Sequence, residues 1–176
     1  KNKSIDYKSF EKLVLHTIDT KCAGMLISAV AGETQNLTFN EKSEIMEFVL
    51  DVNRNIIPII FGCSSSKLDE IFLLVDLAKQ KKINWVLIQA PLNLNERELI
   101  AFYKKINEIG PSHLMIQDLS WDGYGLKDKT IQNLRNEVPK FKSLKIEVVN
   151  AGKKYSNIMN LTKNKLHLTG GWAATG

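Results

Sequence analysis

The chain has 176 residues, 44% of them hydrophobic and 24% charged, a composition typical of a globular domain. Its 24 Lys and Arg residues outnumber the 19 Asp and Glu residues, giving a formal net charge of +5. These basic residues are scattered instead of forming a stripe, so we expect no nucleic-acid partner. No stretch of 18 residues is free of charge, so we expect no membrane partner.

The cysteine and histidine pattern predicts neither a metal site nor a cofactor. Cys22 and Cys63 are the only cysteines, they form no CxxC motif, and the three histidines are scattered. We expect two buried free thiols in a reducing compartment. The first residues contain no apolar stretch of the kind found in signal peptides, which agrees with a cytoplasmic protein.

Helical and strand patterns alternate along the chain. Helical spacing of apolar residues is found at 10–18, 38–52, 66–78, 95–109 and 131–138. Thr38 with Glu41, and Asn95 with Glu98, have the form of helix-capping pairs. Short apolar runs that indicate buried strands occur at 23–30, 55–62, 85–90, 114–117, 144–149 and 166–169. The pattern predicts six strands with a helix before each.

Continuous apolar strands covered by helices predict a parallel α/β sheet, either an open doubly wound sheet or a barrel. The phosphate-binding motifs typical of the open sheet, GxGxxG and GxxxxGK[ST], are absent. Polar residues instead follow nearly every strand, which favours a (β/α)₈ TIM barrel, whose site lies on the loops after its strands. We predict that residues 1–176 are a single domain, an incomplete barrel with about six of eight strands, lacking the first strand and the C-terminal part.

Lys145 is the residue most indicative of chemistry. It lies within the otherwise apolar run LKIEVV, where a lysine is rare unless it is paired or functional. A buried lysine amine loses its proton more easily and can attack a ketone. Glu147 points to the same face and could pair with it. The residues alone leave open a buried ion pair, or an edge strand that exposes both side chains.

Other polar positions follow the predicted strands. Gly32 and Glu33 could offer backbone N–H groups to a carboxylate, or form an ordinary turn. Gly170 and Gly171 would let a ligand approach the backbone, or simply turn the chain. Asp118 could act as an acid or base, or cap the following loop.

Taken together, these segments resemble the dihydrodipicolinate synthase and N-acetylneuraminate lyase superfamily over nearly the whole chain. Residues 29–37 are similar to its Gly-Thr-Thr-Gly-Glu motif, and Gly62 begins a similar Ser-rich turn. Pro91 ends a strand as in the family's Thr-Pro-Tyr-Tyr motif. Lys145 matches the Schiff-base lysine, and its spacing from Gln117 fits the family's spacing from tyrosine to lysine.

The resemblance implies a class I lyase, aldolase or dehydratase that acts on pyruvate or another 2-oxo acid, without a cofactor, as a dimer or tetramer. The implied catalytic and substrate-binding residues are Lys145, Gln117, Asp118 and Glu147, and Val30, Ala31, Gly32, Glu33, Gly170 and Gly171. Gln117 replaces the family's relay tyrosine, and Val30 and Ala31 replace its two threonines. These departures leave the alternative of a paralogue that binds a small carboxylate without turnover. The remaining alternative, independent of them, is an open-sheet ligand domain.

Overall fold

A computed structural model describes residues 4–171. Its sheet contains six parallel strands, hydrogen-bonded in the order β1-β2-β3-β4-β5-β6. The strands are β1 (Met25–Ile27), β2 (Ile59–Gly62), β3 (Trp85–Gln89), β4 (His113–Leu119), β5 (Phe141–Glu147) and β6 (His167–Gly170). The helices are α1 (Tyr7–Asp19), α2 (Phe39–Asn53), α3 (Leu68–Gln80), α4 (Glu96–Ile109), α5 (Asp128–Glu137) and α6 (Ala151–Thr162), with short 3₁₀ helices η1 (Val30–Gly32) and η2 (Thr34–Asn36).

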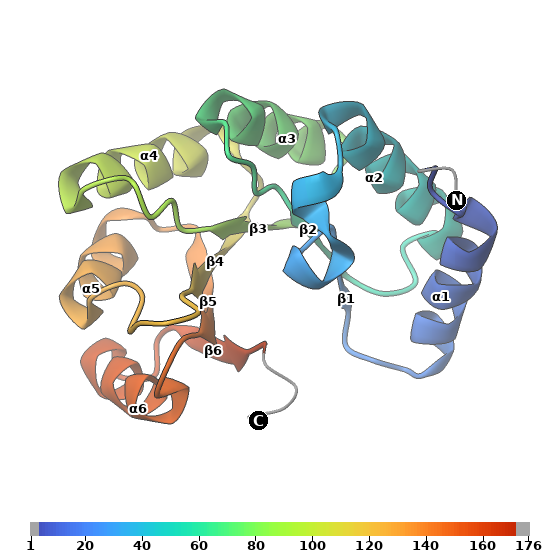
Figure 1. The fold of residues 1–176 in the computed structure, drawn as a ribbon. Helices are drawn as coiled ribbons and strands as arrows, with labels where there is room; N and C mark the ends of the chain where they lie inside the picture. The colour runs from blue at the N-terminus through green and yellow to red at the C-terminus, as the bar shows by residue number, and fades with distance from the viewer. Residues whose placement is uncertain (1–3, 172–176) are drawn as a thin grey trace.

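The strand order identifies the architecture as part of a TIM barrel. Each strand pairs with the next one along the chain, whereas a doubly wound sheet reverses its strand order near the middle. Figure 1 shows the six helices following one another around the outer side of the curved sheet. The structure therefore confirms an incomplete α/β barrel with six strands and excludes the open doubly wound sheet.

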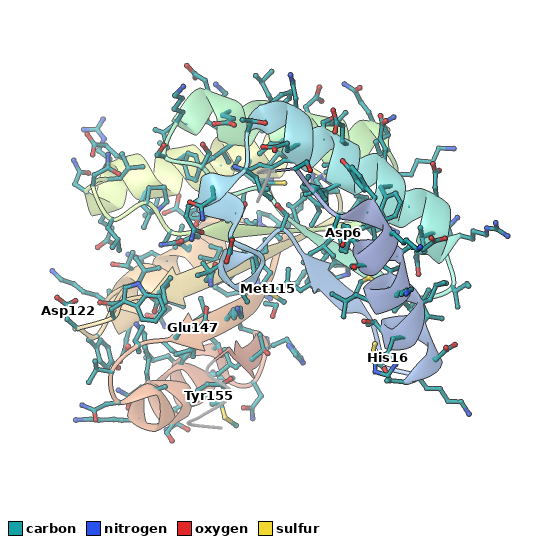
Figure 2. All side chains as sticks on the ribbon, turned by 45° about the vertical axis from the view of Figure 1, so that its right-hand side comes forward. Asp6, His16, Met115, Asp122, Glu147 and Tyr155 are labelled. Carbon is teal, nitrogen blue, oxygen red and sulfur yellow. The ribbon has the colours of Figure 1, made fainter. Side chains whose placement is uncertain are left out.

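The two faces of the strands have different neighbours. Leu144 and Ile146 of β5 belong to the main hydrophobic cluster between sheet and helices, as do Leu114 and Ile116 of β4. Met115 and Leu119 lie on the other face of β4 and are buried outside that cluster. Alternation along a strand therefore puts Lys145, between Leu144 and Ile146, on the inner face of the barrel. Figure 2 shows Met115 and Glu147 on this inner side of the sheet.

Local sequence signals explain where the helices begin. Thr38 caps α2 and Asn95 caps α4, and in both cases the glutamate three residues later completes a capping box, as the sequence predicts. Helix α3 begins differently, because its cap position is Lys67, which makes no side-chain capping bond. Cys63 is buried as expected, but Cys22 is only half buried.

Two strands differ from their predicted extents. The run 23–30 predicts one strand, but β1 ends at Ile27 because Ser28 adopts a left-handed conformation with φ of 56°. Conversely, β4 continues through Gln117 and Asp118 to Leu119. Within residues 4–171, no helix is long and apolar enough to cross a membrane.

Candidate active site

Lys145 and Glu147 lie together on the inner face, near the end of β5. The Lys145 Nζ is 3.1 Å from the Glu147 Oε2, and the two side chains are only 13% and 8% exposed. Strand β5 pairs with β4 on one side and β6 on the other, so the edge-strand alternative is excluded. The pair is thus a largely desolvated ion pair at the carboxyl end of a barrel strand, the end at which barrel enzymes bind substrates.

Gln117 connects this pair to the neighbouring strand. It lies directly beside Lys145 in the β4–β5 register, and its Nε2 donates a hydrogen bond to the same Glu147 Oε2. The Gln117 Oε1 is buried and accepts no hydrogen bond from any described residue. An unpaired buried acceptor costs about 1–3 kcal/mol.

Gly171 packs against both members of the pair. A Cβ at this position would overlap the Glu147 Oε1 and lie 2.6 Å from the Lys145 Cε. A side chain at this position would therefore displace the Lys145–Glu147 pair. Gly170, within β6, has the Tyr155 hydroxyl 3.5 Å from the position of such a Cβ. Of the two predicted glycines, Gly171 is the one in contact with the lysine.

Asp118 lies on the opposite face of β4 and does not meet Lys145. Its carboxylate forms a buried ion pair with Lys154 of α6, and its Oδ1 accepts a hydrogen bond from the Leu126 N–H at 2.9 Å. Burial raises the pKa of the Asp118 carboxyl, and the Lys154 ammonium opposes this shift. Asp118 is thus placed to hold the following loop, which is the alternative to its acting as an acid or base.

The predicted carboxylate cradle after β1 is a compact 3₁₀ turn. The N–H of Gly32 donates to the Ala29 carbonyl and that of Glu33 to the Val30 carbonyl, both at 2.9 Å. These N–H groups are therefore already used within the turn. A Cβ at Gly32 would meet only open space, and it is Glu33 that adopts the left-handed conformation, with φ of 52°.

A groove of about 1330 Å³ opens beside this turn, between the carboxyl ends of β1, β2 and β3. Val30 lines it, whereas Ala31, Gly32 and Glu33 do not. Lys42 of α2 also lines it, and its buried Nζ donates to the Ser64 carbonyl at 3.1 Å. The groove is thus lined by one predicted substrate-binding residue and by a lysine that the sequence did not single out.

Lys154 is a second residue that the sequence interpretation missed. Its side chain is fully buried, although it occurs in the polar segment AGKKYSN. Lys154, Ile158 and Thr162 are all buried and follow one another at four-residue spacing, which places them on one face of α6. This four-residue spacing is the sequence feature that could have identified Lys154 as a buried residue.

Within residues 4–171, no group of three His, Cys, Asp or Glu side chains could hold a metal ion.

Comparison with known proteins identifies the family of the chain. The model of the dihydrodipicolinate synthetase family matches residues 1–175. The chain belongs to this family. Among curated members, the 4-hydroxy-tetrahydrodipicolinate synthase of Lactobacillus acidophilus is 28% identical over 137 residues, which are 76% of this chain and 44% of that protein.

Solved structures of similar proteins share the fold. The crystal structure of dihydrodipicolinate synthase from Aquifex aeolicus superposes with a TM-score of 0.89 at 20% identity, covering 97% of this chain and 59% of that one. The 2-keto 3-deoxygluconate aldolase from Picrophilus torridus gives 0.83 at 19% identity, covering 96% and 61%. The chain thus spans less than two thirds of the length of these relatives.

Proposed function

We propose that the chain carries the Schiff-base centre of a class I lyase, aldolase or dehydratase that acts on pyruvate or another 2-oxo acid. The observation that carries this proposal is Lys145 on the inner face, with Glu147 at 3.1 Å and Gln117 beside it. Membership of the dihydrodipicolinate synthetase family supports the same class of reaction.

Glu147 supplies the proton transfers that the reaction needs. The Lys145 ammonium must first lose a proton, and the Glu147 Oε2 is placed to accept it. The neutral amine then attacks the ketone carbon, and a second proton passes from its nitrogen to the carbonyl oxygen to give a hydroxyl. Glu147 returns the first proton to that hydroxyl, which leaves as water. The product is an iminium between Lys145 and the substrate, which withdraws electrons from the neighbouring carbon–carbon bond.

Gln117 positions Glu147. Its Nε2 donates to the Glu147 carboxylate, and its Oε1 is buried away from solvent, so it orients the carboxylate without contacting a ligand. A hydroxyl of a sugar-derived 2-oxo acid could donate to the Glu147 carboxylate, whereas a second carboxylate would be repelled. Val30 and Ala31 offer no hydroxyl for a relay, so Glu147 acts in its place.

Borohydride trapping tests this function directly. We expect pyruvate, or a hydroxylated 2-oxo acid, to add irreversible mass at Lys145 in the presence of borohydride, and the Lys145→Arg variant to gain none. Lys142→Arg is the matched control, because Lys142 lies on the same strand but is exposed. The absence of an adduct across a panel of 2-oxo acids, or an adduct on another lysine, would contradict the proposal.

The second candidate is a paralogue that binds a small carboxylate without turnover. The observation in its favour is that the Lys145 ammonium is paired with Glu147, which stabilises the unreactive charged form. This candidate predicts that calorimetry detects binding of a 2-oxo acid with the same affinity in the wild-type protein and in Lys145→Arg. A Schiff base would instead require the lysine for tight binding.

A further inference from the structure

The Lys154 ammonium is surrounded by groups of β4 and of the segment that follows it. Its Nζ donates to the carbonyls of Tyr124 and Leu126 at 2.5 and 2.6 Å, forms the buried ion pair with Asp118, and lies 4.4 Å from the centre of the Tyr124 ring. A carboxylate, two carbonyls and an aromatic face are the surroundings of a bound cation. The lysine is in effect a cation tethered to α6.

Asp118, the ion-pair partner of Lys154, also holds the segment that follows β4. Asp118 accepts the Leu126 N–H through its Oδ1. Gly125 has φ of 69°, and a side chain there would overlap that same oxygen. The segment 120–127, which we call the β4–α5 loop, is thereby closed over Asp118 and Lys154 and cannot shift without breaking buried polar contacts.

The β4–α5 loop is in turn hydrogen-bonded to the strand that carries the reactive pair. The Ser120 N–H donates to the Glu147 carbonyl, and the Val149 N–H donates to the Gly123 carbonyl, both at 3.0 Å. Gln117 precedes Asp118 and points to the opposite face, so the ion pair that fixes Asp118 also fixes the backbone that aims Gln117 at Glu147.

We propose that Lys154 is a positioning residue for the Schiff-base centre: its ammonium holds the β4–α5 loop and the end of β4, and so places Gln117 and Glu147 beside Lys145. This inference rests on the proposed function. Replacing a buried ion pair by uncharged residues of similar size is often neutral or stabilising. We therefore expect the two charges themselves to add little stability and to act mainly by placing the loop.

The test combines Lys154→Met with Asp118→Asn, which removes both charges and keeps an oxygen for the Leu126 N–H. We expect this double variant to fold but to melt below the wild-type temperature, because Lys154→Met leaves the carbonyls of Tyr124 and Leu126 without their donor. Its maximal rate of borohydride-trapped adduct formation at Lys145 should fall by about ten- to a hundredfold, because small displacements of reacting groups have effects of this size. The pyruvate concentration for half-maximal rate should change less.

Two further measurements separate positioning from a general loss of structure. Lys153→Met, an exposed neighbour on α6, should trap like the wild-type protein. In Lys154→Ala, added methylammonium should restore part of the rate by occupying the vacated cation position. Hydrogen exchange of the Leu126 amide should be faster in the double variant.

The outcomes distinguish the two proposals. A folded double variant that traps at the wild-type rate, or whose Leu126 amide exchanges at the wild-type rate, would overturn the role of Lys154 and leave the proposed function intact. A wild-type protein that forms no adduct would overturn the proposed function, and the role of Lys154 with it.

Discussion

At the scale of single residues, Glu147 can act on Lys145 in two opposite ways. As a base it removes a proton from the ammonium and promotes attack on the ketone, and as an ion-pair partner it stabilises the unreactive ammonium. The 3.1 Å separation is compatible with both, but the hydrogen bond from Gln117 to the same oxygen fixes the carboxylate beside the amine. These two roles have opposite consequences when the carboxylate is removed.

The Glu147→Gln variant separates them. If Glu147 is the base, we expect the rate of adduct formation at Lys145 to fall by about 10²–10⁴-fold, the usual contribution of general acid–base catalysis. The rate is measured by quenching with borohydride at successive times and weighing the labelled peptide. An exposed glutamate changed in the same way, Glu137→Gln, is the control. A variant that reacts as fast as the wild-type protein, or faster, would assign Glu147 only the ion-pair role.

At the scale of secondary-structure elements, the Glu96 carboxylate of α4 makes two hydrogen bonds to α5. Glu96 accepts hydrogen bonds from the Asn133 Nδ2 at 2.8 Å and from the Thr130 Oγ1 at 2.9 Å. These bonds, that from Asn133 first, hold the pKa of Glu96 below its ordinary value of 4.5. Since the folded-state pKa is the lower one, the stabilisation is fully present above pH 4.5 and is lost as the pH falls through the folded-state value.

Glu96→Gln should therefore lower the free energy of unfolding at pH 7 and have little effect at a pH well below 4.5. Urea denaturation at a series of pH values measures the difference. Glu108→Gln, an exposed change on the same helix, provides the comparison. A Glu96→Gln effect of equal size at every pH would show that the two hydrogen bonds do not depend on the charge.

Element by element, periodicity in the sequence identifies six strands and the first five helices, because one face of each element must be buried. It gives no range for α6. It fails at the end of β1, since Ala29 and Val30 are as apolar as a strand while Ser28 turns the backbone. Periodicity also does not show that Gln117 and Asp118 have different partners. Adjacent strand residues point to opposite faces, but their partners lie about 30 residues away and are invisible to local spacing.

At the scale of the whole molecule, the two ends of the sheet have separate roles. The Lys145 site lies at the carboxyl ends of the strands, and an aromatic contact joins β3 to β4 at their amino ends. There His113 stacks on Trp85, with ring centres 4.5 Å apart and an interplanar angle of 13°. In parallel barrels, residues at the amino ends contribute mainly to stability and those at the carboxyl ends to chemistry.

Strand β4 allows the different roles of the amino and carboxyl ends to be tested within a single element. His113 and Gln117 lie at four-residue spacing on the same face of β4, about 13 Å apart along the strand. His113→Ala should lower the free energy of unfolding by about 0.5–1.5 kcal/mol through the lost ring stacking, and leave trapping at Lys145 unchanged.

Gln117→Met should slow trapping at Lys145 and change stability little, the reverse of His113→Ala. The change removes the buried unpaired Oε1, which limits any loss of stability, but it also removes the hydrogen bond that holds Glu147. We therefore expect slower trapping at a nearly unchanged free energy of unfolding. Equal effects of the two variants on both quantities would mean that β4 responds as one rigid unit, so that stability and reactivity could not be assigned to opposite ends of the barrel.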